Sequence, residues 1–167
     1  RPGAPFDPET NLGPLANERR LAAIESLVDD ARTCGADVLA GGERWGKRGY
    51  YYKPTVLGHV PGQARIMREE PFGPLAVLNR YESLDAVVEA ANSLPYGLAA
   101  YVFTRDAATA ERLAGSLACG TVGINHMTVS TSGVPFGGVR DSGYGREGGI
   151  EGVESYTTVK TVSHLFT

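Results

Sequence analysis

The sequence predicts an α/β protein in which parallel strands are connected by crossover helices. Stretches whose apolar residues recur at helical spacing alternate along the 167 residues with short strand-like runs. One of these runs, Leu75-Ala76-Val77-Leu78, is apolar without interruption, which is typical of a strand buried on both faces of a sheet. Because parallel strands need a long connection, a repeated strand, helix, strand order favours this class.

The first half of the chain is predicted to contain one long helix followed by short strands. Apolar residues recur at helical spacing over 17–33, where Asn17 is a suitable N-cap and Gly35 a suitable C-terminal stop. A strand is expected over 37–40, and shorter β-rich runs follow over 50–57. The helix positions expected to face the core are Leu21, Ile24, Leu27, Val28 and Ala31.

The second half is predicted to alternate helices with strands. A helix is expected over 83–91, with the serine at its first position as the cap. A buried strand over 98–103 precedes a helix that Asp106 caps and Gly120 ends. A third strand is expected over 121–124. The positions expected on the inner faces of the two helices are Leu84, Val87, Val88, Ala110, Leu113, Ala114 and Leu117.

Glycine is concentrated over 133–152, a stretch with too little apolar content for a core. We expect a long ordered loop or a hinge there. Within it, Gly143 to Gly148 match the G-x-G-x-x-G spacing of a dinucleotide-binding loop. That fingerprint needs a buried strand before it and a helix after it, and no strand is predicted to lead in. In a chain with 22 glycines, we interpret the match as chance.

The last segment, over 156–165, is dominated by β-branched and aromatic residues without a following helix. It predicts a long terminal strand. Such a strand exposes unpaired amide and carbonyl groups, which favour pairing with another chain. The alternative, which the residues leave open, is an ordinary edge strand of the chain's own sheet.

Composition and charge exclude several classes of function. Hydrophobic residues make up 42% and charged residues 21% of the chain, as in an ordinary soluble domain. A formal net charge of −3 provides no basic field for nucleic acid, and no apolar run approaches the ~20 residues that span a bilayer membrane. The histidines have no ligand-like spacing, so no metal site is expected. No signal segment opens the chain, and a cytoplasmic protein is expected.

The two cysteines, Cys34 and Cys119, form neither a disulfide framework nor a metal-binding pattern. Each is expected at the C-terminal end of a helix, where the helix dipole disfavours a thiolate. Both are therefore interpreted as structural. No catalytic residue is predicted in this chain.

Three segments are informative when taken together: Glu69-Glu70-Pro71-Phe72-Gly73-Pro74, Asn125 and Pro135-Phe136-Gly137-Gly138. They resemble the C-terminal part of the NAD(P)-dependent aldehyde dehydrogenases. Their order and spacing match the family, and further short motifs agree from the first loop to the last strand. These further motifs are Leu12-Gly13-Pro14-Leu15, Tyr52-Lys53-Pro54-Thr55-Val56, Asn92-Ser93-Leu94-Pro95-Tyr96-Gly97-Leu98, Ser142-Gly143-Tyr144-Gly145-Arg146-Glu147 and Tyr156-Thr157-Thr158-Val159-Lys160.

The resemblance implies a particular domain organisation. Residues 1–155 would be the C-terminal part of an aldehyde dehydrogenase catalytic domain, and residues 156–167 its oligomerisation strand. The family's dinucleotide-binding Rossmann domain, nucleophilic cysteine and general-base glutamate would all precede Arg1. The chain opens with arginine and a loop instead of methionine, so a piece of a longer enzyme, inactive alone, is expected. A small complete protein with a trimmed start is the alternative.

The resemblance also implies two cofactor contacts. In this family the second glutamate of the motif hydrogen-bonds the nicotinamide ribose of NAD or NADP, which implies that role for Glu70. The phenylalanine contacts the nicotinamide, which implies that role for Phe72. Both residue types suit the task, because a carboxylate accepts two hydroxyls and an apolar ring excludes water.

Two further residues are implied at the aldehyde entrance, which the loop between Asn125 and Pro135 lines in this family. Enzymes for neutral or aromatic aldehydes place a large aromatic residue where this chain has Ser130. A serine is similar to the succinate-semialdehyde branch, in which the hydroxyl helps to bind the distal carboxylate. Phe136 is implied as an apolar wall of the same tunnel.

The implied reaction is the NAD(P)-dependent oxidation of an aldehyde, such as succinic semialdehyde or a similar acidic semialdehyde, to the carboxylic acid. The expected partners are the small-molecule aldehyde and further copies of the chain, joined through the terminal strand. Two alternatives stay open. One is a non-catalytic oligomerising or scaffolding module with this fold, and the other is an aldehyde dehydrogenase for a neutral aldehyde.

Overall fold

The computed structural model describes residues 1–166 and divides the chain into two units, Arg1–Arg80 and Tyr81–Thr167. The first unit holds α1 (Glu18–Thr33), β1 (Asp37–Ala40), β2 (Thr55–Gly58), the 3-10 turn η1 (Arg65–Met67) and β3 (Leu75–Leu78). The second holds α2 (Leu84–Asn92), β4 (Tyr96–Gly97), β5 (Ala99–Val102), α3 (Ala107–Ser116), β6 (Thr121–Ile124), β7 (Val139–Arg140) and α4 (Gly149–Glu154).

Both ends of α1 follow from local chemistry. The Asn17 side chain accepts a hydrogen bond from the Arg20 amide at 2.9 Å, which satisfies one of the free donors of the first turn. At the other end Gly35 adopts φ +98°, and the amides of Gly35 and Ala36 donate to the carbonyls of Arg32 and Ala31. This is the Schellman arrangement that favours glycine. The predicted helix, its cap and its stop are confirmed.

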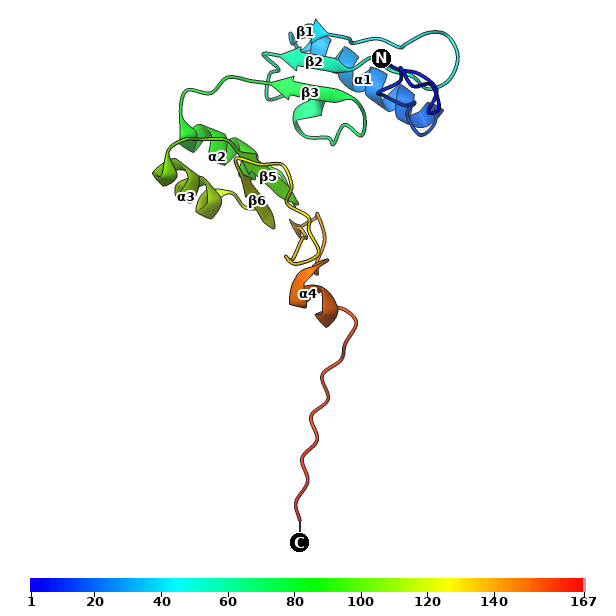
Figure 1. Ribbon diagram of the computed structural model, residues 1–167. Coiled ribbons are helices and arrows are strands. Elements are labelled where there is room, and N and C mark those ends of the chain that lie inside the picture. Colours follow the sequence, from blue (N-terminus) through cyan, green and yellow to red (C-terminus); the bar gives the residue numbers. More distant parts are fainter. Residues whose placement is uncertain (167) are drawn as a thin grey trace. The chain divides into compact units, whose positions relative to one another are not determined.

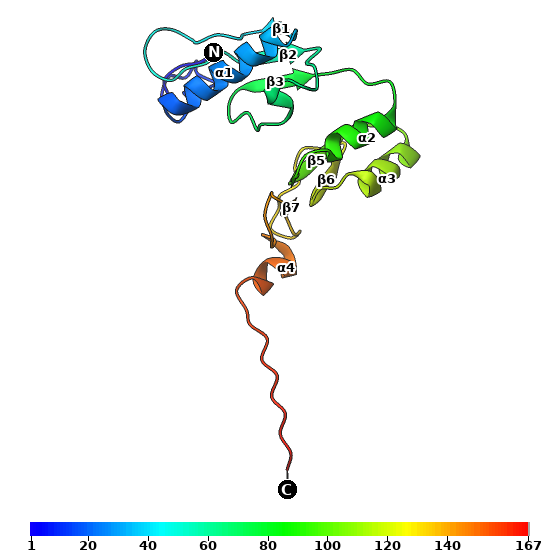
Figure 2. The same ribbon diagram turned by 180° about the vertical axis from the view of Figure 1, so that it is seen from behind.

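The sheet of the first unit has the order β1-β2-β3. Strands β2 and β3 are parallel, as predicted, whereas β1 pairs with β2 in the antiparallel direction. The all-parallel prediction is therefore wrong for β1, because residues 41–54 return the chain directly beside it without a crossover helix. In Figures 1 and 2, α1 runs along one face of the three strands.

The predicted burial of β3 on both faces is also wrong. Its side chains alternate between half-buried and exposed, and Leu78 is 59% exposed. The half-buried side chains, Leu75 and Val77, pack against the core beneath α1. Within this unit no second layer covers the opposite face, so an apolar run that suits two-sided burial is covered on one side only. All five predicted core positions of α1 are buried.

Tyr52 belongs to this core and gives a test of it. Its side chain is 3% exposed among Leu21, Ile24 and Val28, and burial raises the pKa of its hydroxyl from 10.0 to about 12. Because the pKa of Tyr52 is higher in the folded protein than in the unfolded chain, its neutral hydroxyl stabilises the fold fully at pH values below 10. This stability is lost as the pH rises from 10 towards 12. We expect the wild-type protein to lose roughly 2–3 kcal/mol of unfolding free energy over this interval through Tyr52.

The measurement is urea denaturation at a series of alkaline pH values. Tyr52→Phe should keep its stability near neutral pH and lose less of it above pH 10 than the wild type does. Tyr50→Phe, at a side chain that is 40% exposed, is the control. Equal alkaline losses in the wild type and Tyr52→Phe would contradict the prediction.

In the second unit, β5 and β6 form the predicted parallel pair, and α3 makes the crossover between them. The caps of both long helices are confirmed. Ser83 accepts from the Ala86 amide at 3.3 Å, and Asp106 accepts from the Thr109 amide at 2.8 Å. Of the predicted inner positions, Leu113 is buried, Ala114 is exposed, and the others are half-buried.

Two predictions about this unit are wrong. Strand β5 is not buried, since only Val102 among its residues is, and Phe103 just beyond it is 64% exposed. Gly120 does not end α3, which stops at Ser116. The Asn92 side chain ends the helix instead. It donates to the Ser116 carbonyl at 2.8 Å and accepts from the Ala118 amide at 2.7 Å.

The glycine-rich stretch is mostly loop, as expected, but it contains β7 and the short helix α4. A two-residue strand thus precedes the glycine pattern, where none was predicted. Strand β7 is antiparallel to β4 and only half-buried, unlike the buried parallel strand of a dinucleotide site. Gly143, Gly145 and Gly148 all have positive φ. The pattern therefore reflects the turn geometry of this loop.

Residues 157–166 form no helix or strand in the part of the chain that the structure describes. They are exposed throughout, with Val159 at 98%. The predicted strand is consequently not an edge strand of the chain's own sheet, so that alternative is wrong. Pairing with another chain stays a prediction.

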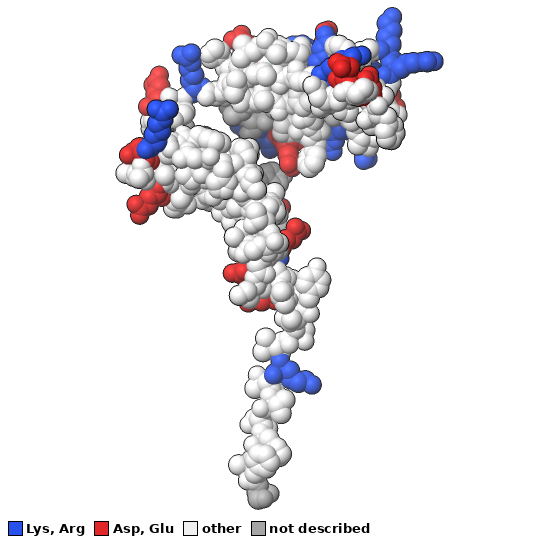
Figure 3. Space-filling model, in the orientation of Figure 1, with Lys and Arg blue, Asp and Glu red and all other residues white. Residues whose placement is uncertain are grey.

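Surface charge shows no dominant sign on the visible face of either unit, where acidic and basic side chains both occur (Figure 3). In residues 1–166, the structure contains no helix that is both long and apolar enough to cross a membrane.

Candidate functional site

The Glu-Glu-Pro-Phe-Gly-Pro segment lies between η1 and β3, against α1. Ile66 in η1 is 6% exposed and anchors the turn in the core. At Gly73, a Cβ atom would lie 2.6 Å from the Cδ1 atom of Ile24 on α1. Any larger residue would therefore have to displace the buried Ile24 side chain for the segment to pass this close to the helix. The backbone from Glu69 to Gly73 is held between two parts of the core.

The two glutamates of the segment have different surroundings. Glu69 receives two hydrogen bonds from the Arg65 guanidinium, at 2.7 and 2.9 Å. This hydrogen bonding holds the pKa of the Glu69 carboxyl below its usual value. The carboxylate of Glu70 is exposed and accepts no hydrogen bond from residues 1–166. Glu70 is thus the carboxylate of this segment that is available to a ligand.

Phe72, two residues after Glu70, has an exposed ring. The ring is 62% exposed, and the Arg20 guanidinium of α1 lies 5.5 Å from its centroid. Such a contact orients the ring without covering it. An accepting carboxylate and an exposed apolar ring, two residues apart on a held backbone, suit a ligand that combines hydroxyls with a flat ring.

In the second unit, the loop that follows β6 begins at a strained residue. Asn125 has φ +59°, a left-handed conformation that asparagine tolerates better than most residues. Its side chain accepts from the Thr104 amide and donates to the Thr104 carbonyl, both at 2.9 Å. These bonds join the carboxyl ends of β5 and β6, the edge at which parallel sheets place their ligands. Ser130 follows in this loop and is exposed.

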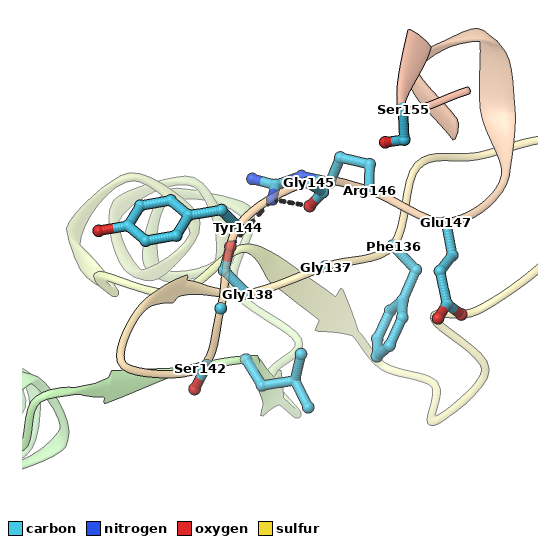
Figure 4. A pocket seen from close by; sticks show the side chains of 11 residues that line it. Phe136, Gly137, Gly138, Ser142, Tyr144, Gly145, Arg146, Glu147 and Ser155 are labelled. Carbon is cyan, nitrogen blue, oxygen red and sulfur yellow. Dashed lines mark hydrogen bonds between the residues drawn. The ribbon is translucent and has the colours of Figure 1, made fainter. Parts of the chain in front are cut away.

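Phe136 lines an open cavity of about 250 Å³ in the second unit (Figure 4). Its backbone pairs with Glu147 through hydrogen bonds of 2.7 and 2.8 Å, and the two side chains point the same way from adjacent segments. The cavity is smaller than the roughly 300–1,000 Å³ of typical small-molecule sites. Its lining residues are Leu98, Phe136, Gly137, Gly138, Ser142, Gly143, Tyr144, Gly145, Arg146, Glu147 and Ser155.

Of the four predicted ligand contacts, the structure places two close together in the chain and leaves the other two apart. Glu70 and Phe72 lie together in the first unit, as predicted for two contacts of one cofactor. Ser130 and Phe136 both belong to the second unit, but Ser130 is not among the residues that line the cavity at Phe136. The ligand roles of all four stay predictions.

Sequence reasoning missed two arginines that organise the second unit. The Arg140 guanidinium donates to the carbonyls of Asn92, Tyr96 and Ala118 at 3.3, 2.8 and 2.8 Å. Arg146 donates to the carbonyls of Gly138 and Gly145 at 2.9 and 2.7 Å. Arg146 lies in one of the motifs named above, but nothing in the sequence shows the partners of either arginine, because these are backbone carbonyls that any residue supplies.

Both cysteines were predicted at the C-terminal end of a helix, and the structure confirms this position for Cys34 only. Cys34 is the C-cap of α1 and packs against its core. Cys119 lies beyond the end of α3, and its thiol donates to the Thr121 carbonyl at 3.2 Å. Both are half-buried and free. In residues 1–166, His, Cys, Asp and Glu side chains form no group of three or more that could hold a metal ion.

Relatives of known sequence agree on one family. The aldehyde dehydrogenase family model matches residues 1–162. The chain is 42% identical over 160 residues to an aldehyde dehydrogenase of Enchytraeus buchholzi, covering 96% of this chain and 32% of that protein. It is 44% identical over 158 residues to a probable NADP(+)-type succinate-semialdehyde dehydrogenase of Sinorhizobium fredii, covering 95% and 32%. The chain thus spans about a third of the length of these relatives.

Solved structures agree as well. The NAD+ complex of an aldehyde dehydrogenase from Bacillus cereus superposes with a TM-score of 0.91 at 40% identity, covering 97% of this chain and 33% of that one. A succinate-semialdehyde dehydrogenase from Burkholderia pseudomallei gives 0.87 at 41% identity, covering 90% and 31%. The α/β architecture, with its parallel strand pairs, is that of a partial aldehyde dehydrogenase domain. The motif segment against α1, the fold around it and these similarities lead to one conclusion, that the chain belongs to the aldehyde dehydrogenase family.

Proposed function

We propose that the protein to which this chain belongs oxidises an aldehyde to the carboxylic acid with NAD(P)+. The observation that carries the proposal is the exposed carboxylate of Glu70 and the exposed ring of Phe72, two residues apart on a backbone held against α1. The similarity to aldehyde dehydrogenases, one of them solved as an NAD+ complex, supports it. The chain's part is to position cofactor and substrate.

The residues of the first unit fit the nicotinamide end of the cofactor. Glu70 would accept hydrogen bonds from the two ribose hydroxyls, and its lack of a partner in residues 1–166 leaves both oxygens available. Phe72 would place an apolar surface against the nicotinamide and exclude water from it. When bound, NAD(P)+ supplies the acceptor for the hydride that leaves the substrate.

An acidic semialdehyde, such as succinic semialdehyde, is the proposed substrate. Ser130 would donate its hydroxyl to the distal carboxylate, where an aromatic residue would desolvate that charge. Phe136 would form an apolar wall of the aldehyde tunnel. The similarity to succinate-semialdehyde dehydrogenases supports this choice.

We assign no nucleophile within the chain, and we propose that it is inactive alone. Cys34 packs against the core at the C-terminal end of α1. The Cys119 thiol donates a hydrogen bond to the Thr121 carbonyl. Their free thiols suit a cytoplasmic location, where disulfides are rare.

The test is NAD(P)H production by the full-length gene product that contains these residues, with succinic semialdehyde and butanal measured side by side. Higher kcat/KM with succinic semialdehyde would support both the reaction and the substrate. An equal or lower kcat/KM with succinic semialdehyde than with butanal would support the proposed reaction and contradict the proposed substrate. No NAD(P)H with any aldehyde would remove the reaction.

Changing Ser130 to alanine tests the substrate contact separately. We expect kcat/KM for succinic semialdehyde to fall by an amount equivalent to about 1.5–3 kcal/mol of transition-state stabilisation, the value of one hydrogen bond to a charged group, while kcat/KM for butanal is unaffected. Ser132→Ala is the matched control, since that serine is exposed in the same loop. A parallel loss with both aldehydes would show that Ser130 does not bind the carboxylate.

The exposed segment over 157–166 favours a second role, as an oligomerising module. Its β-branched side chains have no partner strand in the described residues, and a free strand of this kind pairs readily with another chain. We propose that copies of the protein associate through it, with or without catalysis. The measurement is the molar mass by light scattering after size exclusion, for the protein and for a variant truncated after Ser155. A monomeric mass for both would contradict the proposal.

A further inference from the structure

The turn that precedes Glu70 is held by one arginine. Arg65 begins η1, and its guanidinium contacts Glu69 through two parallel hydrogen bonds, Nε to Oε1 at 2.7 Å and Nη2 to Oε2 at 2.9 Å. A bidentate pair of this kind fixes the direction of both side chains as well as their distance. The Glu69 amide also donates to the Arg65 carbonyl at 2.8 Å. Both the backbone and the side chain of Arg65 therefore hold Glu69 in place.

The same arginine joins this turn to α1. Its Nη1 atom donates to the Ser26 hydroxyl at 2.9 Å, and its backbone amide donates to the Asp30 carboxylate at 2.8 Å. Ser26 and Asp30 are one helical turn apart on α1. All five N–H donors of a guanidinium are fixed in one plane, so contacts to Glu69 and to α1 orient each other.

Glu70 is the next residue, and its own carboxylate has no partner in the described chain. The backbone that leaves Glu69 sets the direction of the Glu70 Cα–Cβ bond, and with it the region that the Glu70 carboxylate can reach. We propose that Arg65 is a positioning residue for the cofactor: by holding Glu69 it directs the Glu70 carboxylate toward the nicotinamide ribose. This inference rests on the proposed role of Glu70.

The charges on both partners persist at neutral pH. The hydrogen bond from Arg65 lowers the pKa of Glu69, and the hydrogen bond to Glu69 raises the pKa of Arg65. The pair is partly exposed: 46% of the Arg65 side chain and 50% of the Glu69 side chain are accessible to solvent. Its effect on global stability is accordingly small, whereas its effect on the neighbouring carboxylate is geometric.

A double-mutant cycle in the full-length enzyme tests the inference. The measured quantities are the KM for NAD(P)+ and, in the absence of aldehyde, the Kd for NAD(P)H from its change in fluorescence on binding. Arg65→Ala should raise this KM roughly two- to fivefold, as expected for a lost partly exposed ion pair. In a Glu70→Gln background the same change should have little further effect, because the carboxylate that it directs is gone. Arg65→Lys, which keeps the charge and loses the fork, should recover part of the affinity.

Arg68→Ala is the matched control, because Arg68 lies in the same segment, is exposed and forms no ion pair within residues 1–166. It removes the same charge and should leave the KM unchanged. If Arg65→Ala fails to fold, Glu69→Gln removes the same pair with the shape retained and should raise the KM similarly.

The outcomes separate the inference from the function on which it rests. An unchanged KM in Glu70→Gln removes the proposed role of Glu70 and the inference with it. If Glu70→Gln raises the KM, the proposed role of Glu70 stands, and the inference about Arg65 is tested by itself. It is overturned if Arg65→Ala has the KM of the wild type, or if its effect adds fully to that of Glu70→Gln. A rise in Arg68→Ala equal to that in Arg65→Ala would assign the effect to net charge and also overturn it.

Discussion

Glu70→Gln is expected to raise the KM for NAD(P)+ by about 10- to 100-fold in the full-length enzyme. The glutamine keeps one accepting oxygen and loses the charge, so of the two charged hydrogen bonds that we propose to the ribose, one is lost and the other becomes neutral. A hydrogen bond to a charged group is worth about 1.5–3 kcal/mol. Nothing in residues 1–166 competes for this carboxylate, so its removal leaves the fold itself undisturbed.

Steady-state kinetics with varied cofactor and saturating aldehyde measure this effect. An interaction made equally in the ground state and the transition state changes KM and leaves kcat. Glu89→Gln on α2 is the control, because that carboxylate is exposed. A Glu70→Gln enzyme with the KM of the wild type would remove Glu70 from the cofactor site.

Gly120→Ala is expected to destabilise the second unit by about 3 kcal/mol, the upper end of what overpacking usually costs. A Cβ atom at this position would lie 1.8 Å from the Gly137 carbonyl oxygen and 3.1 Å from the Gly138 Cα atom. These are backbone atoms and have no rotamer by which to move away. The glycine-rich loop would have to shift as a whole.

Gly115→Ala supplies the matched control for this substitution. Gly115 lies near the end of α3, and a Cβ atom there would meet nothing within 4 Å. We expect it to stabilise the helix by up to about 1 kcal/mol, since alanine loses less backbone entropy than glycine. Urea denaturation followed by circular dichroism gives both values. Equal shifts for the two variants would contradict the close approach of the loop to Gly120.

Features that depend on a few neighbouring residues were determined by the sequence alone. The helix caps at Asn17, Ser83 and Asp106 are confirmed, because each bonds an amide three residues on. Gly35 ends α1 for an equally local reason. The motif at Glu70 could also be found in the sequence, because the carboxylate and the ring that we propose to contact the cofactor lie within a few consecutive residues.

Features that depend on distant residues were decided only by the tertiary structure. Arg140 bonds carbonyls 22 to 48 positions away, and Gly120 is required by a loop beginning 17 residues later, at Gly137. Likewise the pair at Glu69 is joined to α1 through Arg65, 39 positions after Ser26. The direction of β1 and the exposed faces of β3 and β5 belong to the same class. An apolar run specifies that a strand forms, but which of its faces is covered depends on whether another layer packs there.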